Sequence, residues 1–116
     1  MELTSCPIPR WQLLKQQLHN VGPGEFDRLR TAAAEAGTLL DVRNADEFAA
    51  YHLEGARNIS YLGPDFLEEI ATLDPAKEYL VYCRSGRRSV RACTLMKNSG
   101  FTRLVHLDGG LNAYHS

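Results

Sequence analysis

The chain has 116 residues, of which 44% are hydrophobic and 23% charged, the size and composition of one soluble globular domain. It has no apolar run near the roughly 20 residues that a membrane-spanning helix needs, and no secretory signal, so a cytoplasmic protein that does not bind membranes is expected. The net charge is −1, but residues 1–76 carry six basic and twelve acidic side chains, whereas residues 77–116 carry seven basic and two acidic ones. Because the positive charge is concentrated around one loop, it favours a small anion over nucleic acid as the partner.

Short helix-like and strand-like stretches alternate along the chain, which predicts an α/β domain built on a parallel sheet. Pro23 suits the first position of a helix that Gly37 would end, and Asn44 with Glu47 is the start signal of another. Residues 1–17 are predicted to be a helical N-terminal extension packed on a single domain over residues 18–116. Helices are expected over residues 8–17, 23–37, 44–50, 66–70, 89–99 and 111–114, and strands over 18–21, 38–42, 56–60, 79–82 and 104–107.

The helix expected over residues 89–99 is amphipathic. Its apolar arc holds Ala92, Cys93, Leu95 and Met96, so Cys93 is predicted to be buried in the core. Val90 falls on the polar side of this pattern.

Cys83 directly follows the strand expected over residues 79–82 and is the first residue of a basic loop that contains Gly86. Such a loop lies at the carboxyl end of a strand, where open parallel sheets bind ligands. Backbone N–H groups of residues 84–88 can point inward as an anion-binding nest, and the N-terminus of the next helix adds positive potential. Both effects favour the ionised thiolate, so the pattern predicts a nucleophilic cysteine.

The other cysteines and the histidines show no ligand spacing. Three cysteines, Cys6, Cys83 and Cys93, are an odd number without a CxxC pair, which argues against a disulfide framework. The four histidines are scattered relative to them, so neither a metal site nor another cofactor is expected.

Three blocks of sequence form a specific combination. They are Leu40-Asp-Val-Arg43 followed by Glu47-Phe48 and His52-Leu-Glu-Gly-Ala56; Tyr82-Cys-Arg-Ser-Gly-Arg-Arg-Ser89; and Gly100-Phe101 with Asp108-Gly-Gly110. Over roughly residues 18–115 the chain resembles a single-domain rhodanese, a sulfurtransferase. The resemblance implies the rhodanese-like α/β fold, with a five-stranded parallel sheet flanked by helices on both faces.

The resemblance also implies a reaction and roles for the residues of the loop. Cys83 would attack the outer sulfur of thiosulfate or a similar anionic donor, hold that sulfur as a persulfide, and pass it to cyanide or to a thiol, including one on a partner protein. The substrate-binding residues would be Arg84, Ser85, Gly86, Arg87 and Arg88, with Arg84 and Arg87 at the mouth of the loop and Arg88 partly structural. Asp41, Arg43 and Ser89 would support the site, and His52 is expected to make a structural hydrogen bond.

The length of the loop bears on the competing functions. Phosphatase-like and arsenate-reducing relatives use a Cys-x5-Arg loop, and Ser89 stands here where that pattern needs arginine. Phosphate and arsenate are therefore expected to fit poorly. A persulfide relay to a partner protein and a binding module without catalysis are two further hypotheses, and the presence of Cys83 counts against the binding module.

Overall fold

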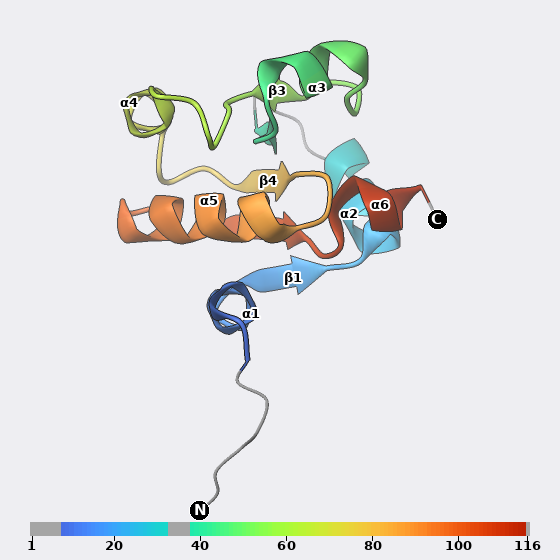
Figure 1. The fold of residues 1–116 in the computed structure, drawn as a ribbon, viewed down its shortest axis with the longest axis horizontal. Helices are drawn as coiled ribbons and strands as arrows, with labels where there is room; N and C mark the ends of the chain where they lie inside the picture. The colour runs from blue at the N-terminus through green and yellow to red at the C-terminus, as the bar shows by residue number, and fades with distance from the viewer. Residues whose placement is uncertain (1–7, 33–37, 116) are drawn as a thin grey trace, which may run out of the picture.

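The computed structural model describes residues 8–32 and 38–115. Within them, five strands pair in parallel in the order β1-β5-β4-β2-β3, which confirms the predicted five-stranded parallel sheet (Figure 1). The strands β4 and β5 have the predicted bounds, whereas the other three are shorter than predicted. The strands are β1 (His19–Val21), β2 (Leu39–Asp41), β3 (Arg57–Asn58), β4 (Tyr79–Tyr82) and β5 (Leu104–Leu107).

Six helices lie before, between or after these strands in the described parts of the chain. They are α1 (Arg10–Lys15), α2 (Pro23–Ala32), α3 (Ala45–Ala50), α4 (Phe66–Ile70), α5 (Arg87–Asn98) and α6 (Gly110–Tyr114). Pro23 opens α2 and Asn44 caps α3 as predicted, while the expected stop at Gly37 lies outside the described residues. None of these helices is long and apolar enough to cross a bilayer.

The helix α5 corrects two predictions. It begins at Arg87, two residues earlier than predicted, because Gly86 takes a left-handed conformation with φ +102° and the chain turns helical directly after it. The sequence pattern puts Val90 on the polar side, but in the structure it is fully buried. Since it precedes Cys93 by three residues, it lies within about 60° of Cys93 around the helix and shares its buried side.

Each face of the sheet has its own apolar cluster. Along β4, Tyr79 and Val81 belong to one cluster and Leu80 and Tyr82 to the other, as expected when successive strand residues point to opposite faces. The first cluster includes residues of α4 and α5, and the second includes residues of α2 and α6. Helices therefore cover both faces, as predicted, and the carboxyl ends of the central strands lie between these two layers.

Candidate active site

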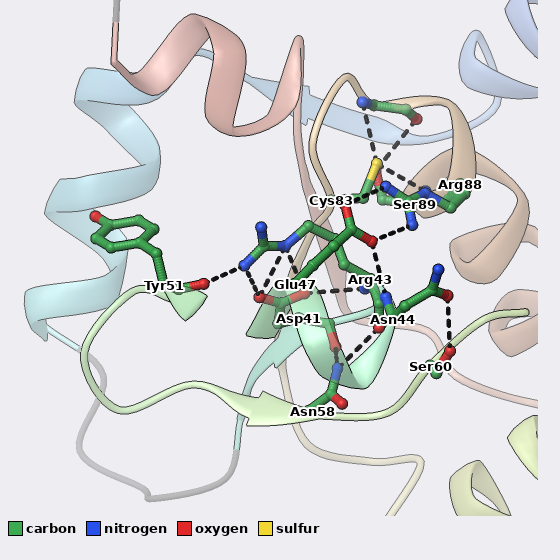
Figure 2. Close-up of polar contacts among 11 residues, drawn as sticks. Asp41, Arg43, Asn44, Glu47, Tyr51, Asn58, Ser60, Cys83, Arg88 and Ser89 are labelled. Atoms are coloured by element: carbon green, nitrogen blue, oxygen red, sulfur yellow. Dashed lines mark hydrogen bonds and ion pairs between the residues drawn. The ribbon is translucent and has the colours of Figure 1, made fainter. Parts of the chain in front are cut away.

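The loop between β4 and α5 begins at Cys83, directly after a central strand. Cys83 is fully buried, and its Sγ accepts hydrogen bonds from the amides of Gly86 at 3.1 Å and Ser89 at 3.3 Å. The Ser89 hydroxyl lies 3.2 Å from the same sulfur (Figure 2). The sequence predicts donors among residues 84–88. Ser89 lies one residue beyond that span, in the first turn of α5, where the backbone N–H groups have no partner within the helix.

The outer side of the loop is fixed by the start of α6. The amide of Leu111 donates to the carbonyl oxygen of Cys83, and the amide of Asn112 to that of Arg84, both at 2.9 Å. Gly110 permits this approach: its φ is +61°, and a Cβ built there would lie 2.5 Å from the Arg84 oxygen and 2.6 Å from the Cys83 oxygen. The pair of glycines after Asp108 thus allows α6 to hold the loop by its backbone.

The three arginines of the loop have different surroundings. Arg84 is exposed, as is Ser85. Arg87 is also exposed, but its guanidinium lies 5.1 Å from the ring centre of Trp11 in α1, within the range of a cation–π interaction. Arg88 is half-buried and forms a two-pronged ion pair with Glu47 of α3, at 2.7 and 3.1 Å (Figure 2). Among the described residues, no ion pair or cation–π contact is recorded for the Arg84 side chain, in contrast to Arg87 and Arg88.

Asp41 and Arg43 form a second, more deeply buried pair at the end of β2. The Asp41 carboxylate is fully buried and accepts from the Arg43 side chain at 2.8 to 3.1 Å and from its backbone amide at 2.9 Å. The Arg43 guanidinium also donates to the carbonyl oxygen of Tyr51 (Figure 2). This pair therefore ties the end of β2 to the segment after α3, and none of its recorded contacts reaches Sγ.

The Glu47–Arg88 pair makes stability depend on pH. Hydrogen bonds from Arg88 are the main cause that lowers the pKa of Glu47 from 4.5 to about 2. Because the folded-state pKa is below the unfolded one, the stabilisation is present above about pH 4.5 and is lost as the pH falls to about 2. Glu47→Gln should lower the free energy of unfolding by about 1 kcal/mol at pH 7 and have little effect near pH 2, measured by urea unfolding across pH.

The glutamine keeps the acceptor for the Asn44 amide, which the Glu47 carboxylate binds at 3.0 Å, so the helix start is preserved. Glu25→Gln is the matched control, since Glu25 forms an exposed pair with Arg28 within α2. If the effect of Glu25→Gln on the free energy of unfolding depends on pH as strongly as that of Glu47→Gln, the larger contribution expected of the Glu47–Arg88 pair is contradicted.

His52 lies outside this set of contacts. It is exposed, its ring stacks on Phe48, and its Nδ1 is 2.7 Å from the Phe48 carbonyl oxygen. This is the local, structural hydrogen bond that the sequence predicts for it.

Two polar residues near the thiol are not evident from the sequence. His106 of β5 is buried, and its Nε2 lies 2.6 Å from the Ser89 hydroxyl oxygen. Its Nδ1 lies 2.8 Å from Oδ1 of Asn20, which pairs with it across the β1–β5 ladder. A histidine inside the apolar strand Leu104–Leu107 is the available signal, but its partners depend on which strands are neighbours.

The family model described as "Rhodanese-like domain" matches residues 23–116, which include the loop and the Asp41–Arg43 and Glu47–Arg88 ion pairs. The chain belongs to the rhodanese-like family. The helix α1 and the strand β1, with Trp11 and Asn20, precede the matched residues of this rhodanese-like domain.

Curated relatives include several sulfurtransferases. "Thiosulfate sulfurtransferase 18" of Arabidopsis thaliana is 32% identical over 102 residues, covering 78% of this chain and 75% of its own length. "Thiosulfate sulfurtransferase 16, chloroplastic" of the same plant is 35% identical over 85 residues, covering 65% of this chain and 71% of its own. "Protein HIGH ARSENIC CONTENT 1, mitochondrial" is 36% identical over 85 residues, covering 65% of this chain, which spans only 50% of that relative.

Solved structures show the same fold. A rhodanese-like domain protein from Staphylococcus aureus has a TM-score of 0.72 at 18% identity, over 84% of this chain and 91% of that one. A rhodanese-like domain from Anabaena has a TM-score of 0.71 at 23% identity, over 83% of this chain and 72% of that one. The rhodanese-like architecture is therefore clear, while the chemistry rests on the residues of the site.

Proposed function

We propose that this rhodanese-like domain is a sulfurtransferase of the thiosulfate type, with Cys83 as its nucleophile. The observation that carries the proposal is the convergence of two backbone amides and one hydroxyl on the Cys83 Sγ. Such donors stabilise negative charge on sulfur, as the thiolate, the persulfide and the transition state between them all require. The names of the sulfurtransferase relatives support the reaction class.

The proposed reaction has two displacements. In the first, the Cys83 thiolate forms a bond to the outer sulfur of thiosulfate, the sulfur–sulfur bond of the donor breaks, and its electron pair leaves with sulfite. In the second, cyanide or a thiolate attacks the terminal sulfur of the persulfide, and the electron pair of that bond returns to Sγ. Because Cys83 is buried, donor and acceptor reach the sulfur only when the groups that cover it move aside.

The loop residues would divide the work in this reaction. Gly86 and Ser89 supply donors to the sulfur, and Arg84, Ser85 and Arg87 line the exposed side where an anion would approach. Arg88 is engaged by Glu47, so we assign it to support of the loop, together with Asp41 and Arg43.

Arsenate reduction or phosphatase chemistry is the second candidate, and one relative's name contains the words high arsenic content. The loop argues against it. The residue at the sixth position after Cys83 is Ser89, whose hydroxyl contacts Sγ, and no guanidinium occupies that position to clamp a tetrahedral oxyanion. A persulfide relay to a partner protein uses the same first displacement and differs only in its acceptor.

Steady-state assays separate these functions. We expect the domain to form thiocyanate from thiosulfate and cyanide and to leave an aryl phosphate intact. The proposal is wrong if the aryl phosphate is cleaved while several sulfane donors leave the protein unmodified.

A cytoplasmic location is a separate expectation for the whole protein, to be tested by fractionation, and two relatives carry the words mitochondrial and chloroplastic in their names.

Arg84→Ala should weaken the use of thiosulfate by increasing KM, roughly 3- to 10-fold at low salt and less at high salt, because steering of a dianion by an exposed charge is screened. Arg87→Ala should have a smaller effect, since its guanidinium is held at Trp11. The measurement is the KM for thiosulfate at two ionic strengths.

Arg103→Ala is the control for this salt dependence, because Arg103 is exposed but directly precedes β5, at the opposite end of the strands. Equal losses at both ionic strengths for Arg84→Ala, or equal effects of Arg84→Ala and Arg103→Ala, would remove Arg84 from substrate binding.

A further inference from the structure

A chain of buried polar groups leads away from the proposed nucleophile into the sheet. The Ser89 hydroxyl oxygen lies 3.2 Å from Cys83 Sγ, 3.2 Å from the carbonyl oxygen of Gly86 and 2.6 Å from Nε2 of His106. Ser89 and His106 are at most 1% exposed. A hydroxyl has a single proton to donate, so these three acceptors compete for it.

Asn20 decides which nitrogen of His106 accepts. Its side-chain Nδ2 donates to the carbonyl oxygens of Lys15 at 2.9 Å and Leu18 at 3.2 Å, which fixes the amide with Oδ1 toward His106. Oδ1 can only accept, so Nδ1 of His106 carries the proton. In the neutral ring Nε2 then carries no proton, and it accepts a hydrogen bond from the Ser89 hydroxyl at 2.6 Å.

The ring is neutral at ordinary pH. Burial is the main cause that lowers the pKa of His106 from 6.5 to about 4. The charged groups that act on the ring are Asp108, which favours the imidazolium, and Lys15, which opposes it, and these two pair with each other. A ring with so low a pKa is a weak base, and its Nε2 faces the Ser89 hydroxyl, so His106 competes with Sγ as a hydrogen-bond acceptor.

We propose, on the basis of the proposed function, that the Ser89 hydroxyl donates its hydrogen bond alternately to Cys83 Sγ and to His106 Nε2 during sulfur transfer. His106, which Asn20 orients, is then a positioning residue for the thiolate. In the thiolate state the negative charge is on Sγ and draws the hydroxyl proton to it. In the persulfide state the charge is on the terminal sulfur, and the hydroxyl turns back to donate its hydrogen bond to Nε2. The step is a rotation about the Cβ–Oγ bond of Ser89, in which no covalent bond breaks and no proton is lost.

The role of His106 is then to limit how strongly Ser89 stabilises the thiolate. A thiolate that is stabilised too well is a weaker nucleophile and a poorer starting point for sulfur loading, because nucleophilicity falls as the thiol becomes more acidic. Removing His106 should leave the hydroxyl to Sγ and the Gly86 carbonyl oxygen, of which the negatively charged Sγ is the stronger acceptor. Removing the hydroxyl should deprive the thiolate of one donor. The two substitutions are therefore expected to act in opposite directions, which damage to the loop alone would not produce.

The test is the pH profile of iodoacetamide alkylation, with modification of Cys83 followed by peptide mass spectrometry. Relative to wild type, Ser89→Ala should raise the pH midpoint by about 1 unit, and His106→Leu should lower it by about 0.5 to 1 unit, as expected for one hydrogen bond to a charged group. The double variant should behave like Ser89→Ala, since His106 acts through the hydroxyl. Shifts of the two single variants in the same direction, or no shift for His106→Leu, would overturn the proposal.

Asn20→Leu gives an independent variant that leaves the histidine in place. Without the acceptor Oδ1, the ring can carry its proton on Nε2 and donate to Ser89, which sends the hydroxyl to Sγ. We expect a lower midpoint, as for His106→Leu, and an unchanged or raised midpoint would contradict the role of Asn20. If His106→Leu does not fold, the result for Asn20→Leu decides.

The persulfide state provides the second readout. At a fixed ratio of thiosulfate to sulfite, His106→Leu should shift the equilibrium from persulfide toward thiolate by about 3- to 10-fold, and Ser89→Ala should shift it the other way, both measured by intact mass spectrometry. Unchanged equilibria in both variants would overturn the alternation. Alkylation needs no sulfur donor, so a failure of persulfide formation with the expected alkylation shifts would reject the proposed function and retain the role of His106.

Discussion

Cys83→Ser should lose sulfur transfer by more than about 10³-fold, because the substitution removes the proposed nucleophile while it keeps the fold of the loop. Serine preserves the shape of the side chain, but its hydroxyl stays protonated at neutral pH and does not attack a sulfane sulfur. In wild type, mixing with thiosulfate should add about 32 Da, the mass of one sulfur, in the intact protein. The same treatment should leave the mass of Cys83→Ser unchanged.

Cys93→Ala is the matched control for this experiment. Cys93 is also a free, buried cysteine, but burial in the core raises its pKa well above the usual range for a thiol, so it stays protonated. The Cys93→Ala variant should gain the sulfur adduct at the wild-type level. An adduct that persists in Cys83→Ser, or that disappears in Cys93→Ala while the fold is intact, would move the nucleophile away from Cys83.

Gly110→Ala should cost about 3 to 5 kcal/mol of unfolding free energy and most of the activity. The added methyl group meets backbone atoms of Arg84 and Cys83 at 2.5 to 2.6 Å, and the residue is held at φ +61°. Strain of this backbone conformation and the steric overlap each cost on the order of 1–3 kcal/mol. Relief of the clash would move α6 off the loop carbonyls and release the loop that positions Sγ.

Gly100→Ala separates the two causes. Gly100 has φ +102°, but a Cβ there would have nothing within 4 Å, so this variant has the conformational cost without the clash. We expect it to lose roughly 1–2 kcal/mol in urea unfolding and to keep near-normal sulfur transfer. Equal losses of stability and activity in the two variants would show that the contact between α6 and the loop does not matter.

The sequence is most informative where one segment suffices for the inference. The buried run Tyr79–Tyr82 followed by Cys83 predicts a strand with the thiol at its carboxyl end, and Asn44 with Glu47 predicts the start of α3. Both signals depend on nearest neighbours in the chain. The sequence pattern extends the anion-binding loop through Arg88 and so starts α5 too late, whereas the left-handed Gly86 makes Arg87 and Arg88 part of the first turn of the helix.

The partners of the loop could not be predicted, because they come from distant parts of the chain. Glu47 reaches Arg88 across 41 residues, and Asn20 reaches His106 across 86. The second contact requires that β1 pairs with β5 in the register that sets these two residues opposite each other. Strand order and register are properties of the assembled sheet, so a polar residue in an apolar strand indicates that a partner exists without identifying it.

The contact between Trp11 and Arg87 gives the domain a built-in optical label. Trp11 is the single tryptophan of the chain, and its indole faces a guanidinium of the loop that follows the nucleophile. Indole emission depends on nearby charge and on exposure to water, so a loop movement that displaces Arg87 changes the fluorescence of the unlabelled protein. A movement of Arg87 during the proposed sulfur transfer can therefore be followed in real time by stopped-flow emission, with no dye attached near the thiol.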